Sequence, residues 1–229
     1  GIHTILREHP ESQVIILDDG FQHRKVKPGL SILLTDYGRL MTRDSLLPFG
    51  RLRESASQRK RADVIIVTKT PDKLDDSERS AIEAELRTGK NQKVLFTTIS
   101  YSRLAPVFEQ SAPAADLPDE KTRNEQAALI LTGIASPGPL ITHLEKYFSE
   151  IRHLQFPDHH FFTPGDIEKI TKTFREISGA VKMIITTEKD AVRLREFSNI
   201  GDQLKKVLYY IPAGVSFLNN DKIEFDKLL

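Results

Sequence analysis

The residues with the clearest chemical potential lie together near the start of the chain. Two adjacent carboxylates, Asp18 and Asp19, are closely followed by an amide, an imidazole and a guanidinium, those of Gln22, His23 and Arg24. Adjacent carboxylates are costly to keep ionised side by side unless a cation or a hydrogen-bond donor lies between them. Mg²⁺ on a nucleotide would supply that cation, because it binds carboxylate oxygens together with substrate phosphates.

An apolar run predicts how this group is positioned. Residues 14–17 are Val, Ile, Ile and Leu, and such a run without alternation is typical of a buried strand in a parallel sheet. The polar group follows directly, at the carboxyl end of the strand, where open α/β sheets bind their ligands. We therefore predict a buried strand over residues 13–17 that presents Asp18 and Asp19 at a sheet edge.

The same segment carries a resemblance to a known family. Residues 18–24, DDGFQHR, resemble the signature of the tetraacyldisaccharide 4'-kinases, which phosphorylate a membrane-bound disaccharide from ATP in lipid A biosynthesis. Four later segments resemble family motifs in the same order: LLPFGRLRES at 46–55, TGIASP at 132–137, FPDHHFFT at 156–163 and TEKDAVR at 187–193. Ser55 replaces the usual proline, Ser136 the usual asparagine and Arg193 the usual lysine, so the match spans residues from about 12 to about 195 with three departures.

The resemblance implies a reaction and a set of site residues. The reaction is transfer of the ATP γ-phosphoryl group to the 4'-hydroxyl of a tetraacyldisaccharide 1-phosphate, with ATP and Mg²⁺ as cofactors. The implied catalytic residues are Asp18, Asp19 and His159. The implied nucleotide or phosphate contacts are Arg53, Gln22 and His23, and the implied metal ligands are Asp19, Gln22 and Glu54. Spacing alone favours a solvated basic helix face for Arg51, Arg53, Arg59, Lys60 and Arg61.

The segment at 156–163 is the second chemical focus. In an extended segment, the adjacent His159 and His160 would point in opposite directions, so at most one of them can serve a given site. The resemblance implies that His159 pairs with an aspartate upstream of this chain and tunes it as the base that accepts the sugar hydroxyl proton. From the residues alone, a structural or metal-linked histidine pair is equally compatible.

Two other motifs have ordinary structural explanations. Thr187 is expected to cap a helix, and Glu188 and Asp190 to complement its dipole. Gly133 is expected to serve a tight turn from a strand into a helix.

Alternating strands and helices predict the fold class. Apolar runs at 31–36, 63–69, 93–101, 127–133 and 182–187 predict strands, and amphipathic helices are expected at 75–87, 137–148 and 166–177. We predict an α/β protein with a P-loop-type, mostly parallel sheet that lacks its N-terminal part, followed by a second, smaller α/β domain. The expected boundaries are 1–110, a linker at 111–126 and 127–229, with the active site between the two domains.

The composition of the chain limits the class of protein and the partners that can be expected. The 229 residues carry a net charge of +1, which gives no overall attraction to nucleic acid, and 39% hydrophobic with 28% charged residues is typical of a globular protein. There is no cysteine, no apolar run of about 20 residues and no signal peptide. We expect a monomer at the cytoplasmic face of the bacterial inner membrane, which binds the lipid A precursor and reaches the membrane surface through an upstream part. The fragment itself is expected to be soluble.

The chain begins at Gly1 and contains no G-x-x-x-x-G-K-[ST] loop. We expect that loop upstream, so this fragment by itself should be inactive. Two other functions are compatible with the residues. A metal-dependent phosphoester hydrolase would hold its metal with Asp18, Asp19, His159 and His160. A nucleotide switch of the metallochaperone type would need a base-reading motif after Val67, which Pro71 disrupts.

Overall fold

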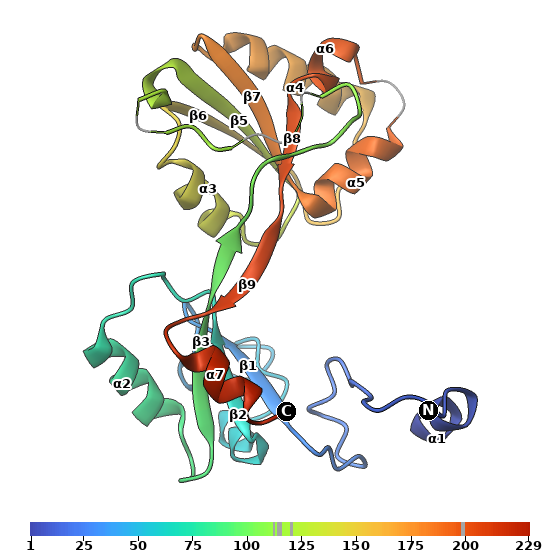
Figure 1. Cartoon of the computed structure of the whole chain (residues 1–229), viewed down its shortest axis with the longest axis vertical. Coiled ribbons are helices and arrows are strands. Elements are labelled where there is room, and N and C mark those ends of the chain that lie inside the picture. The colour runs from blue at the N-terminus through green and yellow to red at the C-terminus, as the bar shows by residue number, and fades with distance from the viewer. Residues whose placement is uncertain (112, 114–115, 120, 198–199) are drawn as a thin grey trace. The chain divides into compact units, whose positions relative to one another are not determined.

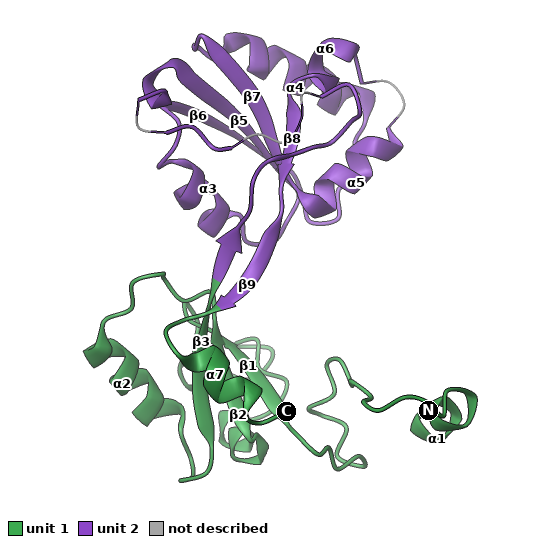
Figure 2. Cartoon of the chain, viewed as in Figure 1, with its two compact units in different colours: residues 1–98, 217–229 green, residues 99–216 purple. Residues whose placement is uncertain are grey.

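Parallel strands form the centre of each half of the chain, as the unalternating apolar runs predict. The computed structural model describes residues 1–111, 113, 116–119, 121–197 and 200–229, and it divides into two units. Unit 1 contains residues 1–98 and 217–229, and unit 2 contains residues 99–216 (Figure 2). Both units are α/β with mainly parallel pairing, which confirms the predicted class. That the sheet is of the P-loop type, with a part upstream, remains a prediction.

Unit 1 is built on a four-stranded sheet in the order β1-β2-β3-β9 (Figure 1). The strands of this sheet are β1 (Ile32–Asp36), β2 (Val64–Thr68), β3 (Lys93–Tyr101) and β9 (Ala213–Phe217). Residues 99–101 of β3 and 213–216 of β9 are counted with unit 2. The helices of unit 1 are α1 (Ile2–Glu8), α2 (Asp76–Leu86) and α7 (Asp221–Asp226), with 3-10 turns at Met41–Arg43 and Ala56–Arg61. The strands β1, β2 and β3 run parallel, so Asp36 and Thr68 come together at their carboxyl ends.

The core of unit 1 explains why the sequence of β2 is apolar without alternation. One face of the sheet packs Ile65 and Val67 against Ile82 and Leu86 of α2. On the other face, Val64, Ile66 and Leu95 pack against the C-terminal residues Phe217, Phe225 and Leu228. Burial on both faces removes the polar alternation that a half-exposed strand would show.

Unit 2 is built on a five-stranded sheet in the order β4-β8-β7-β5-β6. Its strands are β4 (Ala105–Pro106), β5 (Gln126–Thr132), β6 (Glu150–Gln155), β7 (Val181–Thr187) and β8 (Leu208–Ile211). Its helices are α3 (Gly138–Leu144), α4 (Pro164–Glu176), α5 (Glu188–Glu196) and α6 (Asp202–Lys205), with a 3-10 turn at Arg123–Glu125. Only β4 pairs in the antiparallel sense among the described strands of this sheet.

The chain order in unit 2 creates a switch point at β5. From β5 the chain passes through α3 to β6 on one side, and then through α4 to β7 on the other side. Leu140 and Leu144 of α3 pack on one face of the sheet, whereas Ile170 of α4 and Leu194 of α5 pack on the other. Loops that leave neighbouring strands toward opposite faces open a crevice at the carboxyl ends of the strands.

The predicted strand at residues 13–17 is wrong. These residues are irregular, and Val14 and Ile16 are 77% and 88% exposed. The physical reason is that a strand needs a neighbour: β1 is the edge strand, and no described segment pairs with its open side. Leu34 on this edge strand is also exposed. The polar group therefore follows an exposed, extended segment instead of a buried strand.

The two units divide the chain at places other than the predicted 1–110, 111–126 and 127–229. Residues 99–110 belong to unit 2, and residues 217–229 return to unit 1 because α7 packs on its sheet. Unit 2 is not the smaller part. Residues 112, 114–115 and 120 of the predicted linker lie outside the described residues, whereas Ser111 is buried and donates to the carbonyls of Lys205 and Leu208 within unit 2.

Candidate functional site

The first candidate site lies in unit 1, where two of the sequence motifs meet. Arg53 donates from Nη1 to Oδ2 of Asp19 over 2.7 Å, which joins residues 34 positions apart. Asp19 has a left-handed backbone with φ of 49°, and its N–H donates to Oδ1 of Asp18. The two adjacent carboxylates are thus separated in role: Asp18 caps the turn, and Asp19 holds a guanidinium.

Glu54 is the second carboxylate centre of this site. Its Oε2 accepts from Arg61 over 2.7 Å and from Arg24 over 3.3 Å, and the Arg61 guanidinium lies 4.3 Å from the centre of the Phe21 ring. Spacing alone predicted that Arg61 lies on a solvated basic helix face. In the structure, Arg61 instead links the motif at 18–24 to Glu54. Gln22 and His23 lie exposed in the turn between these contacts.

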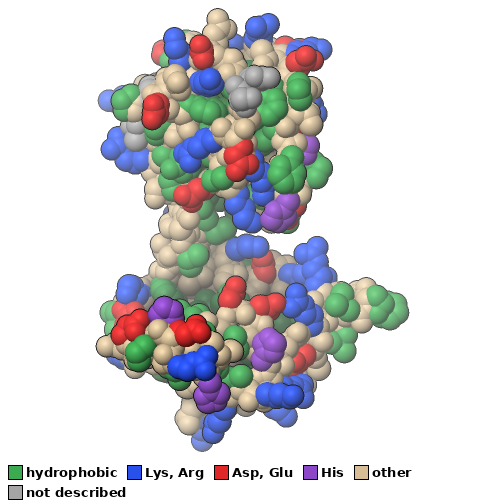
Figure 3. All heavy atoms as spheres, turned by 90° about the vertical axis from the view of Figure 1, so that its right-hand side faces the viewer, with side chains coloured by type: hydrophobic (Ala, Val, Ile, Leu, Met, Phe, Trp, Pro, Cys, Tyr) green, Lys and Arg blue, Asp and Glu red, His purple; other side chains and the backbone are tan. Residues whose placement is uncertain are grey.

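These contacts make an alternating group of carboxylates and guanidiniums, which we call the acid–arginine cluster: Asp18, Asp19, Arg24, Arg53, Glu54 and Arg61. On the face drawn in Figure 3, basic and acidic side chains are likewise interspersed. The Asp19–Arg53 pair is exposed at 75% and 62%, and exposed ion pairs contribute only about 0–1 kcal/mol. Both groups can therefore exchange their mutual contact for a phosphate or a cation at little cost.

Only some residues of the acid–arginine cluster are suited to bind a metal ion. The described residues contain no group of three histidine or acidic side chains that could hold an ion. A Mg²⁺ ion that arrives on phosphates needs only one or two protein carboxylates, however, and Asp18 and Asp19 are adjacent and exposed. Glu54 fits less well, because contact with a metal would require release of both its arginines.

The second candidate site lies in unit 2, where three motifs converge at the carboxyl ends of its strands. Asp190 of α5 is fully buried, and its Oδ2 accepts from the N–H of Gly133 over 2.8 Å and from Oγ1 of Thr187 over 2.7 Å. Its Oδ1 accepts from Nη1 of Arg193 over 3.0 Å, and Nη2 of Arg193 lies 3.1 Å from Nδ1 of His159. Residues of the turns after β5, β6 and β7 thus form one connected network.

Glycine is required at position 133 because the three motifs approach one another closely there, and not because of the backbone angles of Gly133. None of the described glycines has a positive φ, so the expected turn conformation is not the reason for glycine here. A Cβ atom at Gly133 would lie 2.9 Å from Oδ1 of Asp190 and 3.2 Å from the carbonyl oxygen of Pro157. The absent side chain lets the loop at 156–163 approach the buried aspartate.

The two adjacent histidines have different surroundings. His159 has a left-handed backbone with φ of 60° and a side chain that is 70% exposed, whereas His160 stacks on Phe156 and places Nε2 2.9 Å from Asp166. One histidine thus faces solvent and the other packs, although the segment is not extended. Thr187 caps α5, and Thr163 caps α4, as the N-terminal hydrogen bonds show.

Two pKa shifts in unit 2 follow from burial and hydrogen bonding. Burial alone would raise the pKa of Asp166, but hydrogen bonds from His160 and Thr163 outweigh it and lower that pKa. Burial lowers the pKa of His153, whose Nε2 lies 2.7 Å from Oγ1 of Thr132. Both groups hold segments near the carboxyl ends of the strands, Asp166 at the start of α4 and His153 beside Thr132 of β5.

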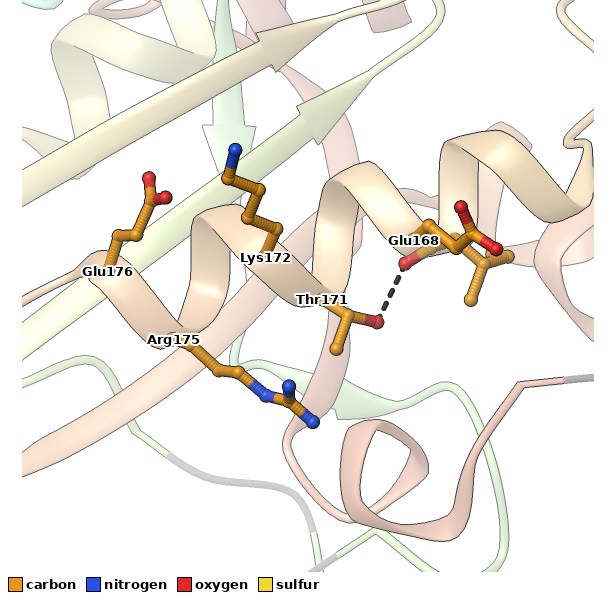
Figure 4. A pocket seen from close by; sticks show the side chains of 6 residues that line it. Glu168, Thr171, Lys172, Arg175 and Glu176 are labelled. Atoms are coloured by element: carbon orange, nitrogen blue, oxygen red, sulfur yellow. Dashed lines mark hydrogen bonds between the residues drawn. The ribbon is translucent and has the colours of Figure 1, made fainter.

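A surface hollow of unit 2 lies elsewhere. It has a volume of about 470 Å³ and lies along the outer side of α4, where Thr171 donates to the carbonyl of Ile167 (Figure 4). Its lining residues are Ile167, Glu168, Thr171, Lys172, Arg175 and Glu176. None of the residues that the sequence singled out lines it, so the candidate sites rest on side-chain networks instead.

Comparison with known proteins gives a consistent result. The family described as tetraacyldisaccharide-1-P 4'-kinase matches residues 1–229. Proteins named tetraacyldisaccharide 4'-kinase are 41% identical in Bacteroides thetaiotaomicron and 42% identical in Parabacteroides distasonis, over 99% and 100% of this chain. The chain covers 61% and 62% of the length of these relatives.

A solved structure supports the fold. The "apo" form of LpxK from Aquifex aeolicus in complex with ATP aligns with a TM-score of 0.58 at 21% identity. The alignment covers 98% of this chain and 59% of that chain. At this identity the likeness concerns the fold.

Proposed function

The chain belongs to the tetraacyldisaccharide-1-P 4'-kinase family, and we propose from this premise that its parent protein transfers a phosphoryl group from ATP to the 4'-hydroxyl of a tetraacyldisaccharide 1-phosphate. The observation that carries this proposal is the 2.7 Å contact between Asp19 and Arg53. It joins the two motifs of unit 1 for which the resemblance implies nucleotide and metal contacts. The hydrolase alternative is not supported, because the relatives are named as kinases.

The acid–arginine cluster suits the phosphate end of the nucleotide. Arg53 would leave Asp19 to donate to phosphate oxygens, since a guanidinium can bind them with two parallel hydrogen bonds. Gln22 and His23, exposed in the same turn, are proposed as further phosphate contacts. Asp19 and Asp18 would then be free to hold a cation, with Gln22 as a further ligand.

The proposed cation is Mg²⁺ on the ATP phosphates. When bound, it would neutralise charge that develops on the phosphoryl oxygens. Asp18 and Asp19 would hold it as oxygen ligands, and Glu54 would remain between Arg24 and Arg61 unless both are displaced. Which of the two aspartates contacts the metal directly depends on how the turn at Asp19 adjusts.

The proposed chemical step is phosphoryl transfer from ATP to the 4'-hydroxyl of the sugar. The 4'-oxygen of the sugar forms a bond to the γ-phosphorus while the bond from that phosphorus to the bridging β–γ oxygen breaks, and ADP leaves. The hydroxyl proton passes to a carboxylate base. His159 is proposed to orient and tune that base through Nε2, since its Nδ1 is already directed at Arg193.

We propose that the parent protein works as a monomer at the cytoplasmic face of the inner membrane. Its lipid partner would be the lipid A precursor, and it would need no nucleic acid. Within the ranges that the structure describes, no helix has both the length and the apolar character needed to cross a bilayer. Contact with the membrane surface through a part upstream of this chain is a separate proposal.

The complete gene product tests the function. It would be incubated with γ-labelled ATP, Mg²⁺ and tetraacyldisaccharide 1-phosphate, and the labelled lipid separated and counted. Asp19→Ala and His159→Ala should each lower turnover by roughly 100-fold, because each removes a group close to the transferred phosphoryl or its proton. Asp226→Ala, which removes an exposed carboxylate of α7 that pairs with Lys222, is the control and should leave turnover unchanged. ATP hydrolysis without labelled lipid in the wild type would overturn the proposal.

A further inference from the structure

The contact between His159 and Arg193 determines which nitrogen of the imidazole carries the proton. Nη2 of Arg193 lies 3.1 Å from Nδ1 of His159. A guanidinium has only donors, so a hydrogen bond at this distance requires Nδ1 to be the acceptor. In the neutral ring, the single proton then sits on Nε2.

Arg193 is itself held in place from the interior. Its Nη1 donates to Asp190, whose side chain is fully buried, and the Arg193 side chain is only 15% exposed. Asp190 is fixed in turn by the N–H of Gly133 and the hydroxyl of Thr187. One guanidinium thus bridges a buried anion and an exposed imidazole, with different nitrogens for each.

We infer that Arg193 is a positioning residue for His159: it keeps Nδ1 unprotonated and so holds the Nε2 proton ready for a carboxylate partner. The meaning of that proton rests on the proposed function, in which His159 tunes the base. A proton on Nε2 allows His159 to donate to that base, whereas a proton on Nδ1 would leave Nε2 as an acceptor that a carboxylate cannot use. The buried Asp190 is the anchor that keeps the guanidinium aimed.

Lysine cannot reproduce this bridge. Its ammonium is a single point of charge, whereas the planar guanidinium presents several donors in fixed directions. A lysine at position 193 can satisfy the buried Asp190 and leave Nδ1 of His159 without its donor. Arg193→Lys therefore removes the positioning role but still neutralises Asp190. Arg193→Met removes both the positioning role and the neutralisation.

The first test does not depend on kinase activity. The ¹⁵N chemical shifts of the imidazole nitrogens would be measured by long-range ¹H–¹⁵N NMR in this chain above neutral pH, with His159→Gln to assign the signals. We expect His159 to be almost wholly the Nε2–H tautomer in the wild type and a mixture of tautomers in Arg193→Lys and Arg193→Met. Equal tautomer populations in the wild type and in both variants would overturn the inference.

The second test uses the complete gene product in the phosphoryl-transfer assay. Arg193→Lys should lower kcat roughly 10- to 100-fold with little change in KM for ATP, because a misdirected group costs rate more than binding. The double variant His159→Ala with Arg193→Lys should be no slower than His159→Ala alone, since Arg193 acts only through His159. Multiplicative losses would show a separate role for Arg193 and overturn the inference.

A control on the same helix completes the design. Arg195 donates to the carbonyl of Val107 and lies over the Tyr210 ring, away from His159. Arg195→Met should leave both the tautomer and kcat unchanged. If the wild type transfers no phosphoryl group, the proposed function fails, and the NMR result still decides whether Arg193 positions the imidazole.

Discussion

At the scale of single residues, two arginine–aspartate pairs show how burial divides roles. The Asp19–Arg53 pair is largely exposed, so it contributes little to stability and each partner remains available to a ligand. The Asp190–Arg193 pair is buried, and its aspartate has three donors. An ion pair of this second kind fixes geometry, which is why we assign substrate contact to the first arginine and positioning to the second.

Gly133→Ala should destabilise the protein. The added methyl would lie 2.9 Å from Asp190 and 3.2 Å from the backbone oxygen of Pro157, both of which are tightly held. Overpacking of this kind costs about 1–3 kcal/mol. We expect a lower midpoint of urea unfolding, followed by circular dichroism.

Gly138→Ala is the matched control for this change. Nothing lies within 4 Å of a Cβ atom there, and the residue is at the start of α3. Alanine is the better helix former, so stability should stay the same or rise slightly. A wild-type midpoint for Gly133→Ala would show that the loop at 156–163 gives way easily.

Motifs draw attention to single residues, but they do not reveal which partners those residues contact. Asp19 and Arg53 both stand in recognisable motifs, and the structure joins them. Asp190 and Arg193 also stand in a motif, at 187–193, but from the residues alone this stretch predicts only a capped helix start in which Asp190 complements the dipole. The partner that gives Arg193 its significance is His159, 34 positions away, and no local pattern reveals such a contact.

At the scale of elements, the hydrophobic pattern predicts strands only where a neighbour exists. The run at 64–68 becomes β2, buried on both faces, whereas the similar run at 14–17 pairs with no described strand and stays largely exposed. The strand β6, EIRHLQ, went unpredicted because charged residues interrupt it at the edge of its sheet. The hydrophobic pattern of a segment indicates its tendency to be buried, whereas its pairing as a strand depends on the rest of the chain.

The C-terminal helix α7 is predicted to be held by one buried carboxylate. Asp221 accepts from Arg79 of α2 and from the N–H of Phe96 in β3, each over 2.7 Å. Asp221→Ala would leave the buried Phe96 amide without its acceptor and the Arg79 guanidinium with Glu83 alone of its two carboxylate partners. Breaking such a pair costs about 3–5 kcal/mol. We expect a matching fall in stability to urea and much faster hydrogen exchange of the Phe96 amide.

Asp226→Ala on the same helix provides the comparison. Its carboxylate pairs with Lys222, and both side chains are more than half exposed. Exposed i,i+4 pairs contribute about 0.3–0.5 kcal/mol, so the urea midpoint should barely move. Similar losses for the two variants would mean that Asp221 acts only by helix propensity and not by anchoring α7.

At the scale of the whole molecule, the chain returns to the unit in which it began. Unit 2 is one continuous segment, 99–216, whereas unit 1 needs both 1–98 and 217–229. Composition placed a boundary in the proline- and alanine-containing stretch at 111–126, because such stretches often link domains. The true division follows from packing between residues more than 100 positions apart, such as Arg79 with Asp221, which composition cannot register.

This division predicts that segment 99–216 folds by itself. All the pairings among β4, β5, β6, β7 and β8 lie within it, as does the packing of α3, α4 and α5 on both faces of their sheet. Isolated 99–216 should give a dispersed amide NMR spectrum and unfold cooperatively in urea.

Segment 1–98 makes the contrasting case, because it lacks α7 and the acceptor for Arg79. It should be poorly structured alone and should regain a dispersed spectrum when 217–229 is joined to residue 98 by a flexible glycine–serine linker. The joined chain restores Asp221 to Arg79 and Phe96 without any residue of unit 2. If 1–98 folds equally well with and without the added segment, the C-terminal return is dispensable to unit 1. If 99–216 collapses without dispersion, the two units are a single folding unit despite their separate cores.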